Sequence, residues 1–162
     1  MKLSHVAADG SIAMVDVSGK AVTQRHARAR AIVRLNDAAR TAVREATLAK
    51  GDALVAAQLA GIMAAKRTAE LIPLAHPLPL ASVGVTFAWQ EDGALAIDAE
   101  ARTSAQTGVE MEAMVAASVA ALTVYDMAKA LDRRITIESV RLLEKTGGKN
   151  PFEAAGSGQD GS

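Results

Sequence analysis

The chain has 162 residues, 50% of them apolar, and its eighteen basic residues balance eighteen acidic ones. A chain of this length can bury the core of one globular domain, and its balanced charge argues against nucleic acid or an anionic membrane as a partner. It contains no cysteine, which excludes disulfides, thiolate metal sites and cysteine nucleophiles and is compatible with a reducing compartment. We expect one domain over residues 1–148, located in the cytoplasm.

Residues 1–20 show no sustained hydrophobic period and no apolar segment typical of a secretion signal. We expect an arm that is either held in extended form by a neighbouring segment or mobile. The longest stretch of low charge lies within residues 107–131 and includes Ser118, Thr123 and many alanines. We therefore do not expect it to span a membrane.

Residues 26–35 (HARARAIVRL) place arginines at one parity and apolar residues at the other, which predicts a half-buried strand. Asn36 or Asp37 can then cap a helix. We expect this helix to continue to about Lys50, because Gly51 provides a C-terminal stop.

A second helix is expected over residues 53–71, with Asp52 as its N-cap and Pro73 as its end. Lys50 and Lys66 each lie near the end of a predicted helix. Such a lysine either complements the helix dipole or binds an anion, and the sequence leaves both roles open.

The loop that follows holds His76 among three prolines, which favour an extended backbone. An imidazole held in this way can donate a hydrogen bond to phosphate or transfer a proton near neutral pH, or it can be an ordinary loop histidine. His5 and His26 are not spaced as metal ligands with it, so we expect no metal site.

Two alternating runs, residues 82–89 and 94–101, flank a turn containing Gly93 and predict a β-hairpin. A long helix over residues 107–131 and a strand over residues 134–143 follow. The order strand, helices, hairpin, helix, strand favours an α+β fold, a ferredoxin-like sandwich whose mostly antiparallel sheet has its helices packed on one face.

Residues 149–162 are glycine-rich and polar, and we expect a disordered tail. Near its start, Lys145 and Lys149 can reach the phosphate oxygens of a ligand, although exposed lysines are usually only solvated.

The long predicted helix carries charge only at its two ends, with Glu110 and Glu112 at the start and Asp126 and Lys129 at the end. A structural explanation suffices for each end, since Thr107 and Glu110 have the spacing of a capping box and Asp126 and Lys129 that of an i,i+3 ion pair. About 21 Å would separate Glu112 from Asp126 along the helix, so one small substrate cannot reach both. Either the ends have unrelated roles, or an antiparallel copy in a two-fold dimer brings them together.

The stretches KGD, AGIMAAKRTAELIPLAHPL, TGVEMEA, ASVAALTVYDMAKA and VRLLEKTGGK resemble the molybdenum cofactor biosynthesis protein C family, the cyclic pyranopterin monophosphate synthases, in consistent order over residues 4–149. The resemblance implies a homohexamer, a trimer of dimers with active sites at subunit interfaces. It implies conversion of 3',8-cyclo-7,8-dihydroguanosine triphosphate to cyclic pyranopterin monophosphate with loss of pyrophosphate, with no cofactor. The implied partner is thus a small-molecule substrate.

The resemblance also implies roles for individual residues, with Asp126, Lys129 and Lys50 as the catalytic group. The positions matching the family's substrate-binding residues are Leu74, Ala75, His76, Glu110, Met111, Glu112, Lys145, Arg25 and Lys66. Opening the purine ring needs proton transfers, for which an aspartate and lysines whose pKa is depressed by cationic neighbours are suitable. Lysine, arginine and histidine can neutralise the leaving pyrophosphate.

Three positions depart from the family pattern. Ala75 and Ala13 stand where relatives often have cysteine and histidine, and Gln106 stands where many have a basic residue, which could weaken anion binding. Two alternatives to the synthase are a non-catalytic oligomeric nucleotide-binding scaffold of the same fold and a phosphohydrolase or cyclase that uses a divalent ion. The second lacks an acidic or histidine ligand cluster in the sequence.

Overall fold

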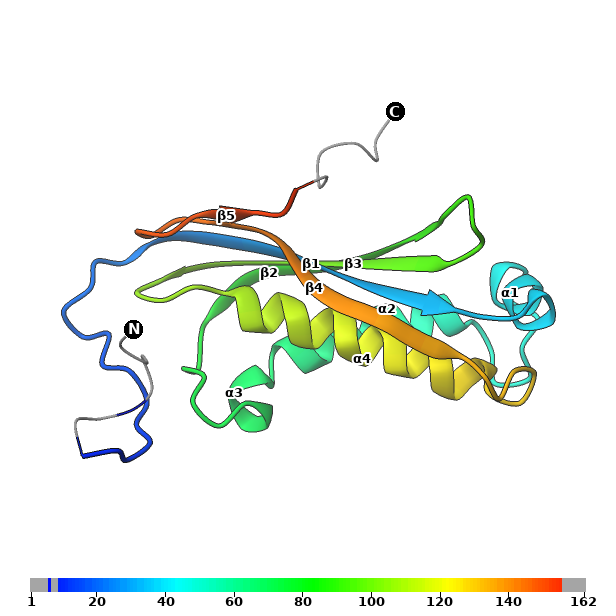
Figure 1. The fold of residues 1–162 in the computed structure, drawn as a ribbon, viewed down its shortest axis with the longest axis horizontal. Helices are drawn as coiled ribbons and strands as arrows, with labels where there is room; N and C mark the ends of the chain where they lie inside the picture. The colour runs from blue at the N-terminus through cyan, green and yellow to red at the C-terminus, as the bar shows by residue number, and fades with distance from the viewer. Residues whose placement is uncertain (1–5, 7–8, 156–162) are drawn as a thin grey trace.

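The structure is a computed structural model that describes residue 6 and residues 9–155 (Figure 1). Its elements are β1 (Thr23–Arg34), α1 (Asp37–Arg44), α2 (Ala53–Ala65), α3 (Thr68–Leu71), β2 (Leu80–Trp89), β3 (Leu95–Ala105), α4 (Glu110–Ala128), β4 (Thr136–Thr146) and β5 (Phe152–Glu153). Every predicted strand is present, although each begins or ends a few residues away from its expected boundary.

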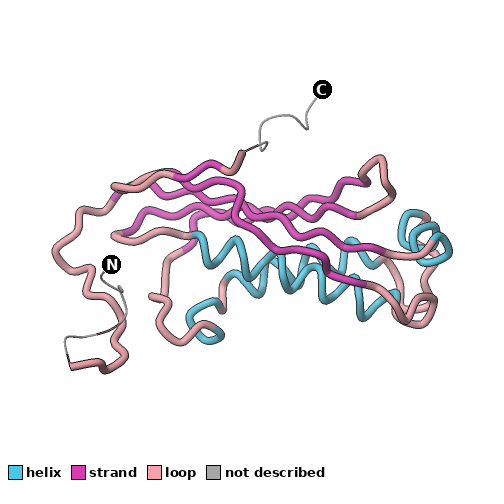
Figure 2. Tube along the Cα trace, in the orientation of Figure 1, coloured by secondary structure: helices cyan, strands magenta, loops and turns pink. Residues whose placement is uncertain are grey.

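The strands form one antiparallel sheet in the order β2-β3-β1-β4-β5, and α2 and α4 cover one of its faces (Figures 1 and 2). The first strand therefore lies at the centre, between the second strand of the hairpin and the strand that follows the long helix. This arrangement confirms the predicted α+β, ferredoxin-like fold.

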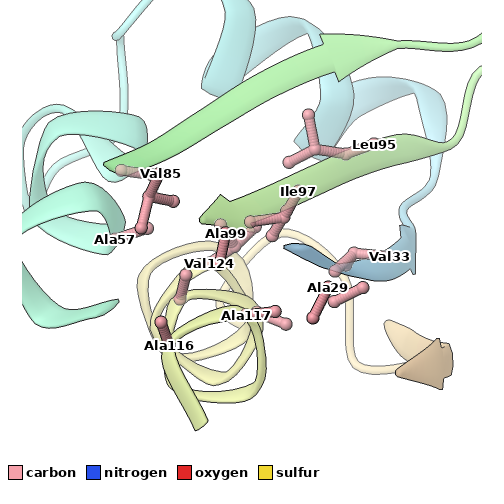
Figure 3. Packing of buried hydrophobic residues seen from close by; sticks show 14 of the residues in the cluster. Ala29, Val33, Ala57, Val85, Leu95, Ile97, Ala99, Ala116, Ala117 and Val124 are labelled. Carbon is pink, nitrogen blue, oxygen red and sulfur yellow. The ribbon is translucent and has the colours of Figure 1, made fainter. Parts of the chain in front are cut away.

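Small side chains form the layer between the sheet and the helices. Alternate residues of β1 from Ala27 to Val33 are fully buried, as the alternation of the sequence predicts. Figure 3 shows Ala29 and Val33 of this strand facing Ala117 of α4 across the core. Because alanine adds so little bulk, α4 can lie close to the sheet, and its position fixes where both of its charged ends lie.

The first helix is shorter than predicted, ending at Arg44 instead of about Lys50. Asn36 caps it as expected, its side chain accepting from the Ala39 amide at 2.8 Å. At the other end Ala46 adopts a left-handed conformation, with φ of 53°, and interrupts the helix before Gly51. The sequence offers no glycine at this point, so the end could not be predicted from turn chemistry.

The second predicted helix is divided into α2, which ends at Ala65, and α3, which begins at Thr68. Asp52 caps α2 as predicted, accepting from the amides of Leu54 and Val55 at 2.9 and 3.1 Å. The Thr68 side chain is buried and donates to the Ala65 carbonyl at 2.9 Å, satisfying a group that the interrupted helix leaves open.

The predicted capping box at the start of α4 is wrong. The helix begins at Glu110, its N-cap is Val109, and the cap makes no side-chain hydrogen bond. Glu110 instead points to Lys145 of β4, with Oε1 at 3.3 Å from Nζ. The α4 helix is long and apolar enough to cross a membrane, but 50% of its apolar window is buried inside this fold, as expected of a core helix.

Both ends of the described chain are more ordered than the sequence suggests. β5 pairs with β4, and the Ala154 amide donates to the Leu143 carbonyl at 2.7 Å, so disorder is the wrong expectation for residues 149–155. The rest of the expected tail, residues 156–162, lies outside the described residues. In the N-terminal arm, residues 9–20 are extended or turned and contact the loops next to α4.

Candidate active site

One candidate cluster lies at the C-terminal end of α4. The Lys50 Nζ lies 2.9 Å from Oδ2 of Asp126 and 3.0 Å from its carbonyl oxygen. The Lys129 Nζ lies 2.6 Å from the other carboxylate oxygen, Oδ1. About half of each side chain is exposed, with values of 49%, 56% and 53% for Lys50, Asp126 and Lys129. The residues that the resemblance assigns to catalysis are therefore in contact at the surface, where a second molecule can reach them.

The two lysines determine the charge state of Asp126. The hydrogen bond from Lys129, followed by that from Lys50, lowers the pKa of Asp126 to about 2. The same hydrogen bond raises the pKa of Lys129, which is opposite to the depressed lysine pKa expected from the sequence. In the single chain, this arrangement gives a carboxylate that is ionised at neutral pH and a protonated lysine that can act as an acid.

The N-terminal end of α4 has a different kind of carboxyl group. Glu112 is only 4% exposed, and burial, with a smaller contribution from the Glu110 charge, raises its pKa from 4.5 to about 7. A carboxyl group with such a pKa can gain or lose a proton near neutral pH. The two ends of α4 thus carry one carboxylate that stays ionised and one that titrates.

A cavity of about 340 Å³ adjoins this N-terminal end. Of the residues expected to bind substrate, the structure brings Leu74, Ala75, His76, Glu110, Met111 and Glu112 into its wall. Val15, Val17 and Lys20 of the N-terminal arm complete the wall on another side. The loop after α3 and the start of α4, which are far apart in sequence, therefore form one site together with the arm.

A second cavity of about 630 Å³ shares Lys20, Thr107, Gly108 and Glu110 with the first. Its wall contains the predicted cations Arg25 and Lys145 and the glycine-rich turn after β4. In that turn Gly147 and Gly148 have φ of 84° and 73°. A Cβ at Gly148 would collide with the Arg25 guanidinium, so glycine permits this close approach.

The orientation of His76 is fixed by the arm. Its Nε2 lies 2.8 Å from the Val15 carbonyl oxygen. A carbonyl oxygen only accepts, so Nε2 carries the proton and donates. The remaining nitrogen, Nδ1, can donate to a phosphate only when the ring is doubly protonated. With neutral His76, the N–H group is therefore used for the hydrogen bond to the arm and is not free to bind a phosphate.

Several predicted residues are not brought together in one chain. Lys50, Asp126 and Lys129 lie at the opposite end of α4 from both cavities and line neither of them. Lys66, the C-cap of α2, is also outside both walls. Among the described residues no three histidine, aspartate or glutamate side chains are grouped as metal ligands, and the expectation of no metal stays a prediction.

Sequence reasoning missed several residues of the cavity walls, and four of them carry polar groups or lie in a motif: Thr107, Gly108, His26 and Lys20. Thr107 and Gly108 belong to the TGVEMEA motif, so the motif could have indicated them. His26 lies on the predicted strand, and its place in the wall depends on the sheet register. Nothing in the arm's composition points to Lys20, whose place depends on how the arm folds back.

The fold and the two cavities define a small α+β protein whose cavities are lined by lysine, arginine and carboxyl groups. Residues 14–148 match the model of the MoaC family. The chain belongs to the MoaC family.

Three relatives illustrate the similarity, and each is named cyclic pyranopterin monophosphate synthase. The protein of Novosphingobium aromaticivorans is 52% identical over 148 residues, which are 91% of this chain and 94% of the relative. That of Syntrophomonas wolfei is 49% identical over 151 residues, 93% of this chain and 96% of the relative. That of Herpetosiphon aurantiacus is 54% identical over 147 residues, 90% of each chain.

Proposed function

We propose that the chain is a cyclic pyranopterin monophosphate synthase, a lyase of molybdenum cofactor biosynthesis. Its substrate is 3',8-cyclo-7,8-dihydroguanosine 5'-triphosphate, and its products are cyclic pyranopterin monophosphate and pyrophosphate. The observation that carries the proposal is the similarity to relatives of that name, about half identical over at least 90% of this chain. The domain responsible is expected to span residues 1–148.

The cationic cavity supports binding of the triphosphate. Arg25 and Lys145 line it, and Arg25 Nε is buried without a hydrogen-bond partner among the described residues. The Glu110 Oε2 is buried and unpaired in the same way. A buried donor and a buried acceptor without partners are costly, and a polar ligand with phosphate and purine groups would satisfy both.

The Lys50, Asp126 and Lys129 cluster supports the chemical step. Lys129 is protonated and hydrogen-bonded to Asp126, so it can protonate the leaving nitrogen of the purine ring. Asp126 holds both ammonium groups in place, and its hydrogen bond raises the pKa of Lys129. Lys50 can neutralise charge that develops on oxygen.

The separation of the two clusters supports assembly of each site from two chains. The α4 helix has 19 residues, so its ends are roughly 28 Å apart. Its surface also exposes Leu122 and Tyr125, and α2 exposes Val55 and Leu59. These apolar side chains suit an interface with another copy, within a homohexamer built as a trimer of dimers in the cytoplasm.

The experiment that tests the function uses purified protein and the cyclic dihydroguanosine triphosphate. We expect pyrophosphate release in step with formation of a product that becomes a fluorescent pterin after oxidation. Binding without either product would favour the non-catalytic scaffold. Product formation that stops on adding a chelator would favour the metal-dependent alternative.

A further inference from the structure

The N-terminal arm forms part of the wall of both cavities. Val15 and Val17 are half-buried and line the cavity of about 340 Å³ that also contains His76, while the intervening Asp16 is exposed. This alternation is that of an extended segment with one covered side. Lys20, at the end of the segment, lines both cavities.

Gln106 and His76 attach the arm to the body of the protein. The Gln106 Nε2 donates to the carbonyl oxygens of Ser18 and Lys20, at 3.3 and 3.0 Å. His76 Nε2 donates to the Val15 carbonyl at 2.8 Å. Both donors come from loops next to the start of α4, so the arm is held at two points about four residues apart.

The part of the arm that Gln106 holds is itself a defined turn. The Lys20 amide donates to the Val17 carbonyl at 2.9 Å, and the Ser18 amide donates to Oδ1 of Asp16 at 2.9 Å. A turn closed by its own hydrogen bonds loses little further conformational entropy when it docks. Gln106 therefore positions the whole turn, including Lys20, through a single amide group.

The same residue connects the turn to the cationic wall. The main-chain carbonyl oxygen of Gln106 accepts a hydrogen bond from Nη2 of Arg25 at 3.3 Å. Lys20 has no acidic partner for its ammonium group among the described residues, although it borders the cavity that also contains Arg25 and Lys145. An anion in that cavity would meet cations from the arm, β1 and β4.

We propose that Gln106 is a positioning residue that docks the arm and thereby places Lys20 as a further binding group for the polyphosphate of the substrate. The identity of the substrate rests on the proposed function, but the docking of the arm does not. This gives Gln106 a role of its own at a position where a basic side chain would contribute charge directly.

The first measurement is amide hydrogen exchange of the ligand-free protein, read at Ser18 and Lys20. Gln106→Met keeps the length of the side chain and removes its donors, and we expect both amides to exchange at least about tenfold faster. Gln106→Lys restores a donor and should return the exchange close to that of the wild type. Exchange that is unchanged in Gln106→Met would overturn the docking role.

The second measurement is calorimetric titration with inorganic tripolyphosphate. We expect Lys20→Met to weaken binding at least about threefold while leaving the Ser18 amide protected. The substitution removes the charge but keeps the main-chain carbonyl oxygens to which Gln106 donates. Gln106→Met should weaken binding by a similar factor. A matched control is Arg44→Met, which removes a cation that packs on Trp89, outside both cavities, and should leave the affinity unchanged.

These outcomes separate the inference from the proposed function. If the arm is released and tripolyphosphate still binds as tightly, the role of Lys20 is wrong whatever the reaction is. If exchange and binding change as expected but no pterin forms from the cyclic nucleotide, the inference stands and the proposed function fails.

Discussion

The ammonium nitrogen of Lys50 lies 2.9 Å from Oδ2 of Asp126, although the two residues are 76 positions apart in sequence. The contact exists because the chain between α1 and α2 passes the C-terminal end of α4. It turns the i,i+3 pair of Asp126 and Lys129 into a carboxylate with an ammonium group on each oxygen. The surface-pair interpretation of the sequence is correct but incomplete, because it includes only one of the two cations.

We expect Asp126→Asn to remove turnover while leaving the fold intact. The Asp126 side chain is more than half exposed, so loss of its negative charge should change the melting temperature little. Loss of the negative charge leaves two adjacent ammonium groups without their counter-charge. We therefore expect pyrophosphate release to fall by more than a hundredfold, which corresponds to an activation barrier higher by about 2.7 kcal/mol. A rate above about a tenth of the wild-type value would contradict the catalytic role.

A matched control for this variant is Asp37→Asn. Asp37 forms the same kind of i,i+3 pair, with Oδ1 at 2.7 Å from the Arg40 guanidinium, and it lines neither cavity. We expect this substitution to leave the rate of pyrophosphate release unchanged.

The pKa of Asp126 should respond unequally to its two lysines. Lys129 makes the larger contribution to lowering it from 3.8 to about 2, so Lys129→Met should raise this pKa more than Lys50→Met does. Carbon-detected NMR titration of the Asp126 carboxyl group measures both changes. Because the folded pKa is depressed, the pairing stabilises the wild type above pH 3.8, and this stabilisation is lost as the pH falls towards 2. Equal shifts in the two variants would contradict the ranking.

We expect Glu112→Gln to make stability less dependent on pH. The pKa of Glu112 is raised from 4.5 to about 7, so the wild type loses stability as the pH rises through this interval and the buried carboxyl ionises. The variant should be more stable than the wild type at pH 8 by about 1–2 kcal/mol. The full pKa shift would correspond to roughly 3 kcal/mol, but Glu112 borders a cavity in which water can screen its charge. Near pH 4 the difference should disappear.

Urea unfolding at several pH values measures this change. The exposed Glu91, in the turn between β2 and β3, provides the control variant Glu91→Gln, whose stability should follow that of the wild type at every pH. A Glu112→Gln advantage that is the same at pH 4 and pH 8 would show that packing, and not ionisation, is responsible.

Glu112→Gln and Asp126→Asn are each expected to be inactive alone, because each removes a carboxyl group of the proposed site. They should rescue each other if each site contains both ends of α4 from different chains. When Glu112→Gln and Asp126→Asn are unfolded and reassembled together, about half of the dimers are mixed, each with one intact and one doubly altered site. About a quarter of the wild-type activity should return, measured as pyrophosphate release. Reassembly of each variant alone is the control. Mixed oligomers in the mass spectrum without activity would place the site within one chain.

Most strands and helices, and the antiparallel hairpin, were predictable from local patterns in the sequence, whereas the order of the strands in the sheet was not. Alternation in residues 26–35 and in the hairpin predicted which faces of β1, β2 and β3 are buried, because side chains alternate between the two faces of a strand. Asn36 and Asp52 predicted two helix starts, because their short side chains accept from the first free amides. Asp126 and Lys129 were identifiable as a pair from their spacing alone.

Which of these residues come into contact depends on the tertiary fold. Thr107 and Glu110 have the spacing of a capping box, but the contact between Glu110 and Lys145 of β4 replaces it. The helix before Lys50 ends early, because Ala46 takes a left-handed conformation that no local signal indicates. The place of Lys20 between the cavities depends on Gln106, 86 positions away. Local spacing fixes neighbours within about four residues, whereas contacts over longer separations depend on how the sheet and helices pack around the alanine-rich core.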